Sequence, residues 1–202
     1  SLRCYDQQNE PEKSIEFYQQ FIDEDPFAYQ AWYNLGLLYT KINMLEKATE
    51  AFDYAIVIKE DYAPGHQQLG KTYLVLGNYE KAIEHLTFYI QHTRPNVATY
   101  CQIADCYQNL EKQELARDYY RKALDVNNDY AEAWYGMGIT YQKEMRYQQA
   151  IPFLEKAVGL KEEEDYWFAL ADSYNFLSRE EQAKGAYRKA IEIDPTLIEA
   201  WT

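Results

Sequence analysis

A tyrosine recurs along this chain at an almost constant interval. The recurring residues are Tyr5, Tyr39, Tyr73, Tyr107, Tyr141 and Tyr174, which lie 34 residues apart except for a final step of 33. A single globular core gives no reason for such a period. A stack of similar units does, because each unit must offer its neighbour the same surface. The period therefore predicts a repeat array, with the missing residue of the last step in a turn around 159–163.

Small and large apolar residues keep the same period. Glycine recurs three residues before the tyrosine, as at Gly36 and Gly70, and a large apolar residue recurs thirteen after it, as at Phe52 and Leu86. Within each unit the apolar positions are spaced by three or four residues on two segments, which predicts two amphipathic helices. The small residues let the helices approach closely, and the large ones fill the space beside them. No segment alternates with period two for long enough to form a strand, so the predicted fold is all-α.

This spacing resembles the tetratricopeptide repeat family, whose pattern places Trp, Leu-Gly, Tyr, Ala, Phe and Ala at set intervals. The stretch 32–36, with Tyr39, Ala48, Phe52 and Ala55, is a close match, and the resemblance extends over essentially all 202 residues. The resemblance implies an α-solenoid: a right-handed superhelix of antiparallel helix-turn-helix units. It also implies a scaffold for protein–protein interaction.

The period divides the chain into a single array over residues 1–202. We predict a partial repeat at 1–28, full repeats at about 29–62, 63–96, 97–130, 131–163 and 164–197, and the start of a further repeat at 198–202. Trp201 stands 34 residues after Trp167 and would open that last repeat. A stand-alone array would end in polar caps. Since both ends cut through repeats, we expect the chain to be a fragment of a longer protein.

Charge and hydropathy restrict the class of partner. The chain has 33 acidic and 20 basic residues and a net charge of −13. This argues against nucleic acid as a partner, since phosphate contacts require basic patches. It favours basic or neutral protein partners. No apolar run is long enough to span a bilayer, so no membrane contact is expected within residues 1–202.

Cysteine and histidine provide no metal site or disulfide framework. Cys4, Cys101 and Cys106 are too few and too unevenly placed, and free thiols favour a cytoplasmic location. His85 and His92 are seven residues apart, whereas a helical metal pair needs a spacing of three or four. His66 occupies the position of the repeat's Trp, so we expect it in the core.

Enzymatic motifs are absent as well. The sequence has no Gly-rich phosphate loop, no nucleophile elbow and no HExxH. The acidic run 162–165 lies where a first helix should begin, and carboxylates there offset the helix dipole. The chain is therefore expected to be non-catalytic and to need no cofactor.

The resemblance places ligand binding on the concave surface, which the first helix of each repeat lines. Counting from the start of each repeat, places two, five, six, nine, twelve and thirteen should face this predicted groove, and Phe176 is at place thirteen. Place five gives Tyr33, Gln67, Cys101, Tyr135 and Phe168; place six gives Asn34, Gln68 and Gln102; place nine gives Leu37, Lys71, Asp105, Ile139 and Asp172.

These residues exclude one ligand class and suggest another. Relatives that grip a C-terminal carboxylate need Lys, Asn and Arg at places five and nine; here only Lys71 fits and Asp105 would repel the carboxylate. The amides of Asn34, Gln68 and Gln102 could instead hold the main chain of an extended peptide, since an amide both donates and accepts. The alternative is that Asn and Gln are simply common at place six, and the series stops after Gln102.

In the second half of the groove, Tyr135, Ile139, Phe168 and Phe176 could form an apolar patch for a partner's anchor residues. Asp105 and Asp172 would flank it and attract a Lys or Arg. Alternatively, these aromatic groups pack against one another between repeats. We predict a scaffold that binds a peptide segment of another protein in the groove. A structural spacer or self-association module, and the targeting arm of an enzyme whose catalytic domain lies elsewhere, remain alternatives.

Overall fold

The computed structural model of the chain describes residues 11–94 and 96–195. Over these residues it contains eleven α-helices and no strand, which confirms the all-α prediction. The helices are α1 (Pro11–Glu24), α2 (Tyr29–Lys41), α3 (Leu45–Ile58), α4 (Ala63–Val75), α5 (Tyr79–His92), α6 (Val97–Asn109), α7 (Gln113–Val126), α8 (Ala131–Lys143), α9 (Tyr147–Leu160), α10 (Glu164–Phe176) and α11 (Glu180–Ile193). Tyr5, Cys4 and Trp201 lie outside the described residues, as do the opening of the partial repeat at 1–28 and the repeat start at 198–202.

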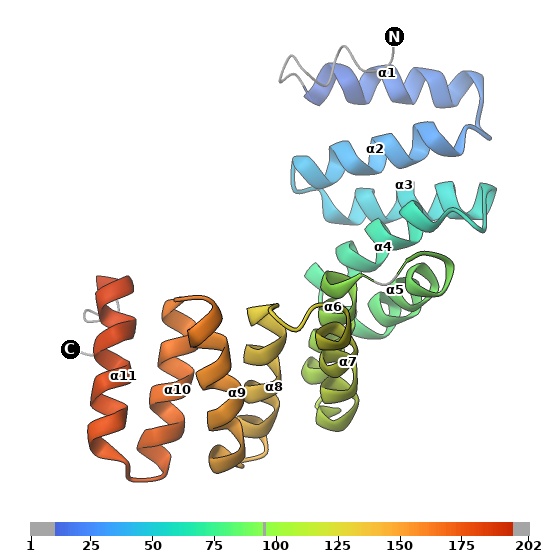
Figure 1. The fold of residues 1–202 in the computed structure, drawn as a ribbon. Coiled ribbons are helices and arrows are strands. Elements are labelled where there is room, and N and C mark those ends of the chain that lie inside the picture. Colours follow the sequence, from blue (N-terminus) through green and yellow to red (C-terminus); the bar gives the residue numbers. More distant parts are fainter. Residues whose placement is uncertain (1–10, 95, 196–202) are drawn as a thin grey trace. The chain divides into compact units, whose positions relative to one another are not determined.

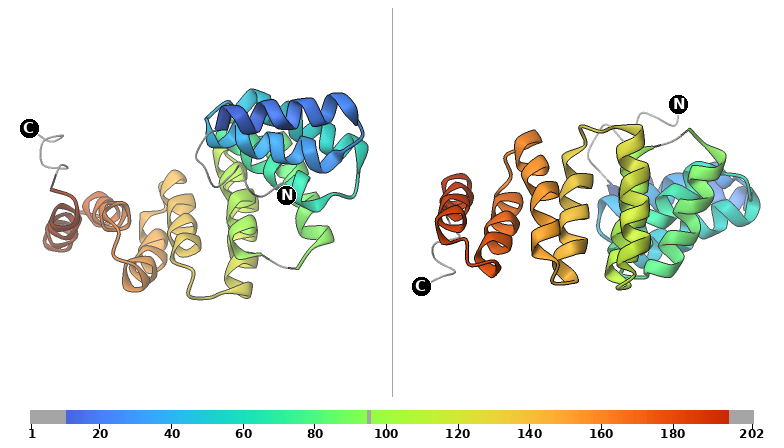
Figure 2. Two further views of the ribbon diagram at one scale, coloured as in Figure 1. Left: turned by 90° about the horizontal axis from the view of Figure 1, so that it is seen from above. Right: turned by 60° about the horizontal axis from the view of Figure 1, so that its bottom comes forward.

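The helices divide between two compact units, residues 1–94 with α1–α5 and residues 95–202 with α6–α11. In each unit a first helix pairs with the second helix that follows it: α2 with α3, α4 with α5, α6 with α7, α8 with α9, and α10 with α11 (Figure 1). Successive pairs stack within a unit, α3 on α4, α7 on α8 and α9 on α10, as Figure 2 shows from two further directions. The predicted helix-turn-helix architecture is confirmed. A single continuous array and its right-handed superhelix stay predictions.

The turn inside each pair ends in a left-handed residue. Backbone φ is between 57° and 74° at Asn43, Gly77, Glu111, Met145 and Ser178. The next residue then donates its N–H to the carbonyl of the periodic tyrosine five positions back, at 2.8–2.9 Å in all five pairs. This pattern is the Schellman ending of a helix. At two turns the left-handed residue is glycine or asparagine, so the sequence predicts the helix ending there. At the other three turns it is a residue for which left-handed φ costs about 1–2 kcal/mol.

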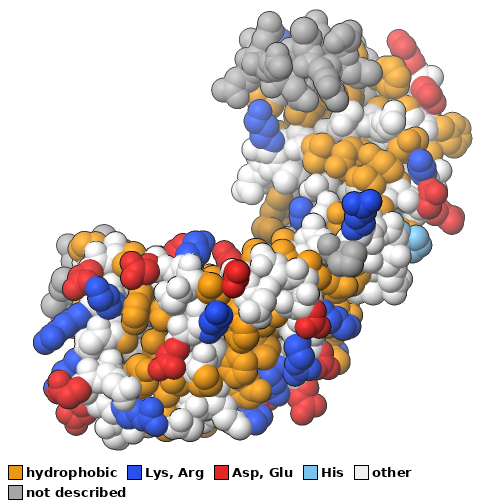
Figure 3. Space-filling view, in the orientation of Figure 1, with side chains coloured by type: hydrophobic (Ala, Val, Ile, Leu, Met, Phe, Trp, Pro, Cys, Tyr) orange, Lys and Arg blue, Asp and Glu red, His pale blue; other side chains and the backbone are white. Residues whose placement is uncertain are grey.

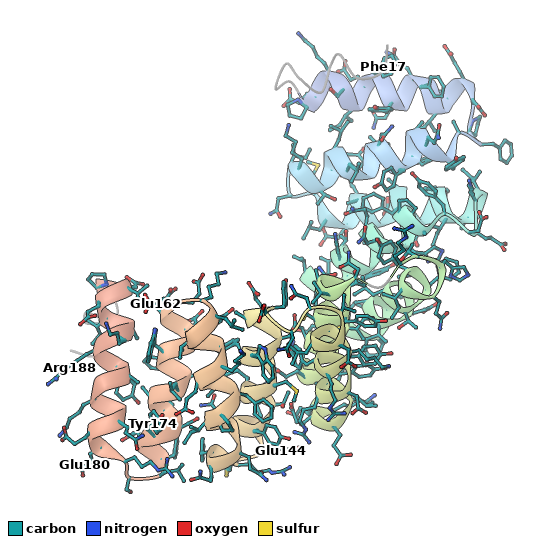
Figure 4. The ribbon with its side chains drawn as sticks, in the orientation of Figure 1. Phe17, Glu144, Glu162, Tyr174, Glu180 and Arg188 are labelled. Atoms are coloured by element: carbon teal, nitrogen blue, oxygen red, sulfur yellow. The ribbon has the colours of Figure 1, made fainter. Side chains whose placement is uncertain are left out.

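The turns within pairs and the connections between pairs lie at opposite ends of the helices. In residues 95–202, Figure 4 shows Glu144 and Glu180 at one end and Glu162 at the other. The connection between pairs has four residues in most cases, such as 59–62 and 127–130, but three residues, 161–163, between α9 and α10. The residue that the period loses is therefore missing from this connection.

The side chain of the periodic tyrosine joins one pair to the second helix before it. Tyr73 donates its hydroxyl to Asp53 on α3 at 3.4 Å, and Tyr174 donates to Glu155 on α9 at 2.6 Å. Gln19 on α1 donates its amide to the Tyr39 hydroxyl at 3.2 Å. At these three positions the period thus has a physical cause, because each tyrosine makes a contact with the helix before its own pair.

Small buried residues and large ones alternate in the core of each unit. Four alanines, Ala48, Ala82, Ala116 and Ala150, are completely buried. The large side chain four positions after each of them is buried as well. In the space-filling view, hydrophobic side chains of the 95–202 unit gather in bands on the face shown, with charged side chains between the bands and at the edges (Figure 3). Among the helices that the structure describes, none has the length and apolar character needed to cross a membrane.

Candidate peptide-binding surface

In residues 1–94 the predicted groove residues lie on the first helices α2 and α4. Leu35 and Leu69, on the same helices, are buried against the core. The predicted residues point elsewhere and are partly or fully exposed: Tyr33, Asn34, Leu37, Gln67, Gln68 and Lys71. The two helices thus present aromatic, amide and aliphatic groups, with one lysine, on an accessible surface.

Tyr33 connects these two helices. Its ring lies edge-on to Tyr62, with ring centroids 5.2 Å apart, and 5.7 Å from the ring of Phe52. Burial raises the pKa of the Tyr33 phenol, and a hydrogen bond with the Gln68 side chain partly offsets the rise. One amide of the predicted series is therefore placed against the aromatic residue of the preceding first helix.

Asn34 lines a cavity of about 330 Å³ between α1 and α2. Its wall includes the aromatic rings of Phe21, Phe27 and Tyr29 and the side chain of Asp25. The cavity has room for one side chain of a ligand, with an amide and a carboxylate within its lining.

In residues 95–202 the predicted groove residues lie on α6, α8 and α10. Six of them are partly exposed: Gln102, Asp105, Tyr135, Ile139, Phe168 and Asp172. Cys101 is buried, with 7% of its surface exposed, and burial raises the pKa of its thiol to about 12. That thiol is protonated at neutral pH and can contribute shape but no charge.

Each of the two groove carboxylates accepts a hydrogen bond from a tyrosine of its own repeat. Tyr120 donates its hydroxyl to Asp105 at 2.5 Å, and Tyr187 donates to Asp172 at 2.5 Å. Burial raises the pKa of the Asp105 carboxyl, which the hydrogen bond from Tyr120 partly offsets. Burial also raises the pKa of the Tyr120 phenol, as does the negative charge of Asp105. These carboxylates have intramolecular partners that the sequence alone did not suggest.

The aromatic residues of the predicted apolar patch each contact a different ring. Tyr135 stacks on Tyr166 with centroids 4.5 Å apart, and Phe168 lies edge-on to Tyr187 at 5.5 Å. Phe176 is 65% exposed and stacks on Tyr147 at 4.2 Å. These contacts fit packing between helices, although all of these groove residues except Cys101 keep accessible surface.

Two further glutamines of this unit differ in their partners. Gln142 donates its amide to the Ala169 carbonyl at 2.6 Å and lies 2.8 Å from the Ser173 hydroxyl, so it ties α8 to α10. The side-chain oxygen of Gln102 is buried and has no hydrogen-bond partner among the described residues. Gln102 is therefore one of two glutamines of this unit, with Gln113, whose buried side-chain oxygen has no partner among the described residues.

The histidines form a packed pair. His66 is buried, its Nε2 lies 3.0 Å from the Glu60 carbonyl, and its Nδ1 lies 3.1 Å from Nδ1 of His85. His66 thus takes the structural place of the repeat's Trp, as expected. No group of three or more His, Cys, Asp or Glu side chains within the described parts of the chain could hold a metal ion.

Three residues of the α2–α4 surface, Tyr29, Lys59 and Tyr62, were not expected from the sequence. Tyr29 and Tyr62 pack edge-to-face with centroids 4.9 Å apart, and the Lys59 ammonium lies 4.9 Å from the Tyr29 ring centroid. Tyr29 opens α2, while Tyr62 immediately precedes α4. Tyr29 is the first residue of the repeat 29–62 and Tyr62 is its last, so both fall outside the places counted for the groove.

Models of the tetratricopeptide repeat match the chain at residues 5–63, at 63–87 and 97–130, and at 129–194. The chain belongs to the tetratricopeptide repeat family. The chain is 22% identical over 199 residues to the tetratricopeptide repeat-containing protein trd-1 of Caenorhabditis elegans, covering 96% of this chain and 24% of that protein. It is 26% identical to anaphase-promoting complex subunit 7 of Dictyostelium discoideum, covering 85% of this chain and 29% of that protein. The chain thus spans about a quarter of the length of these relatives.

Solved structures support the same fold. The crystal structure of MamA superposes with a TM-score of 0.74 at 20% identity, over 82% of this chain and 97% of that one. YrrB, described as a TPR protein with an unusual peptide-binding site, superposes with a TM-score of 0.70 at 21% identity, over 90% of this chain and 94% of that one. At these identities the likeness establishes the fold alone.

Proposed function

We propose that this tetratricopeptide repeat chain is a non-catalytic scaffold that binds a peptide segment of another protein along its first helices. The observation that carries the proposal is the surface of α2 and α4, where amide and aromatic side chains of successive repeats are accessible and adjoin one another. Asn34 lines a cavity, and the Gln68 side chain is hydrogen-bonded to the Tyr33 hydroxyl. Amides spaced one per repeat can hold main-chain N–H and C=O groups, while the cavity accepts a side chain.

The second unit supports the proposal in a different way. Its place-nine carboxylates are held by tyrosines, and its aromatic rings stack on their neighbours. The side-chain oxygen of Gln102 has no partner among the described residues, but it is buried and so is not presented to a ligand. We infer that the α2–α4 surface contributes more of the peptide affinity than the patch around Tyr135, Phe168 and Phe176.

The names of similar proteins support the proposal of a scaffold role in a larger assembly. One relative is a subunit of the anaphase-promoting complex by name, and YrrB is described by its peptide-binding site. We propose a protein partner, and from the net charge of −13 no nucleic acid. The cytoplasmic location predicted from the free thiols remains part of the proposal.

The test compares two double variants with the same chemistry. Asn34→Ala with Gln68→Ala removes two groove amides, while Gln20→Ala with Gln91→Ala removes two exposed amides from the second helices α1 and α5. A partner captured from the source lysate should bind the groove variant about tenfold more weakly, because two buried hydrogen bonds are worth about 1–3 kcal/mol together. The control variant should bind like the unaltered chain.

Equal binding by both variants would contradict the groove proposal and direct attention to the second helices. The spacer or self-association alternative predicts a size in solution that rises with concentration, which light scattering on the same samples measures. The targeting-arm alternative concerns residues outside 1–202 and is compatible with either result.

A further inference from the structure

A compact cluster of tyrosines lies at one end of the α2–α4 surface. We call Tyr29, Tyr33 and Tyr62 the tyrosine cluster. The Tyr62 ring is edge-on to both others, with centroid distances of 4.9 Å to Tyr29 and 5.2 Å to Tyr33. All three are partly exposed. The three residues thus keep accessible surface beside Asn34 and Gln68, the amides of the proposed peptide-binding surface.

A cation of the chain itself lies over these rings. The Lys59 ammonium is 4.9 Å from the ring centroid of Tyr29 and 5.8 Å from that of Tyr62. Lys59 follows the last residue of α3 in an extended conformation, and its own backbone is bonded to Ala55 and Tyr62. Among the described residues, its ammonium has no carboxylate partner within ion-pair distance. The rings of Tyr29 and Tyr62 are the contacts of this ammonium that the structure shows.

The electrostatics of the cluster favour a cation. An aromatic face carries negative potential, so a cation within about 6 Å of the centroid is attracted, and the attraction grows as water is removed. Burial, and the neighbouring Tyr33 and Tyr29, raise the pKa of the Tyr62 phenol. The phenol therefore remains neutral at physiological pH and keeps an unchanged ring face. The net charge of −13 adds long-range attraction for a cationic ligand.

We propose that the tyrosine cluster is the place where this surface receives a cationic side chain of the bound peptide, with Lys59 occupying the site when no peptide is present. The inference rests on the proposed peptide-binding function and names the chemistry of its ligand. Arginine fits best, because its planar guanidinium stacks on aromatic rings. The neighbouring cavity, which shares Tyr29 and contains Asp25 in its wall, then accepts the adjoining part of the ligand.

The roles of Lys59 and of the rings can be tested with a ligand smaller than a peptide. The probe is N-acetyl-arginine amide, and its neutral counterpart is N-acetyl-citrulline amide, which has nearly the same shape. Binding is followed by the NMR shifts of isotope-labelled tyrosine rings at 150 mM salt, where charges more than about 8 Å away are largely screened. The arginine probe should shift the resonances of Tyr29 and Tyr62, and the citrulline probe should not.

Four variants locate the effect. Lys59→Ala removes the competing cation and should strengthen arginine-probe binding roughly two- to fivefold, the factor expected for one exposed cation–π contact. Lys47→Ala makes the same change of charge at a lysine placed over Tyr39, at 5.7 Å, and should leave the affinity unchanged. Tyr62→Leu should weaken binding by a similar two- to fivefold, and Tyr29→Phe, which keeps the ring face, should retain it.

Equal shifts from the two probes, or equal gains from Lys59→Ala and Lys47→Ala, would overturn the proposal. The outcome is separable from that of the peptide-binding function. A captured partner that depends on Asn34 and Gln68 but not on Tyr62 would leave the groove function standing and refute the cation site. A probe that binds as expected, with no partner dependent on the groove amides, would do the reverse.

Discussion

The tryptophans of the first helices differ in the hydrogen bonding of their indole N–H groups, and the difference follows from the one-residue shortening of a connection. Trp32 donates to the Pro26 carbonyl at 2.9 Å and Trp134 to the Asn128 carbonyl at 2.7 Å, six residues back in each case. His66 uses the carbonyl of Glu60 in the same way. Trp167 follows the shortened connection 161–163, and its buried Nε1 has no partner among the described residues.

This difference predicts unequal effects of one substitution. Trp134→Phe removes a hydrogen bond, whereas Trp167→Phe removes a donor that is buried and unpaired, so the second change should lower the free energy of unfolding by about 1 kcal/mol less. Both changes shrink the ring equally, which makes the pair a matched comparison. Urea unfolding of the two variants measures the difference, and Trp32→Phe should behave like Trp134→Phe. Equal losses for all three would show that the indole bond contributes nothing.

The histidine pair makes stability depend on pH. Since the Glu60 carbonyl can only accept, Nε2 of His66 carries its proton, and Nδ1 of His66 accepts from His85. Burial, and next the neighbouring His66, lower the pKa of His85 to about 4. The folded pKa lies below the unfolded value of about 6.5. The stabilisation is therefore complete above pH 6.5 and is lost as the pH falls toward 4, because the unfolded chain binds the proton first.

We predict that His85→Gln reduces this dependence. Between pH 7.5 and pH 5 the variant should lose less of its free energy of unfolding than the unaltered chain, by on the order of 1 kcal/mol once screening at this partly exposed site is allowed for. Carboxylates contribute equally to both proteins, so the difference between their two pH profiles is the quantity to measure. His92→Gln, at an exposed position on the same helix, is the control. Parallel profiles for the unaltered chain and His85→Gln would contradict the prediction.

At the scale of helices, packing depends on where a Cβ is missing. A Cβ on Gly36 would lie 2.5 Å from the Phe52 ring, and one on Gly138 would lie 2.5 Å from Leu154. These glycines recur with the period and let the helices of one pair approach. Gly136 serves a different contact, since its Cβ would overlap the Tyr120 ring of the preceding pair. The amide series of place six stops at Gly136 for this reason.

Alanine substitutions should therefore have opposite effects at two glycines. Gly136→Ala should lower the free energy of unfolding by about 1–3 kcal/mol. The reason is that the Tyr120 ring, whose hydroxyl is hydrogen-bonded to Asp105, cannot move away from the new methyl group without losing that bond. Gly185→Ala lies on an exposed face of α11 with nothing within 4 Å, and should raise the free energy of unfolding by about 0.5–1 kcal/mol through helix propensity. Thermal unfolding of the two variants decides the matter, and a neutral Gly136→Ala would mean that the α7–α8 contact is loose.

The sequence was sufficient to predict the helices, but it did not predict which side chains bond to one another. Fold and pairing follow from recurring small and large residues, whose positions depend on contacts within about 34 residues. The bonds of Asp105 and Asp172 depend on a tyrosine fifteen residues later, at Tyr120 and Tyr187. Where place nine holds Leu37 and not an acid, the residue fifteen positions later is a phenylalanine and not a tyrosine. The sequence therefore contained a signal for the pairing of acid with tyrosine. The Lys59 contact had no such signal, since it depends on side-chain directions at a connection between pairs.

At the scale of the whole chain, the two units differ in how many complete pairs they contain. Among the described residues, the 95–202 unit includes three pairs, α6–α7, α8–α9 and α10–α11, whereas the 1–94 unit includes two pairs and α1. In a repeat protein each pair is stabilised mainly by its neighbours, and about three repeats are needed for a stable fold. The number of complete pairs should therefore set the stability of each unit when it stands alone.

We predict that residues 95–202, produced separately, retain their helices and unfold cooperatively, and that residues 1–94 are less stable. The buried residues of the second unit support this, because Ala104, Tyr120 and Leu154 lie in cores made only of its own helices. Circular dichroism measures the helix content of each piece, and urea unfolding measures its stability. The length of the pieces is similar, so chain length does not explain a difference. If residues 1–94 proved as stable as 95–202, the number of complete pairs would not be the controlling quantity, and the aromatic contacts of α2, α3 and α4 would have to supply the missing stability.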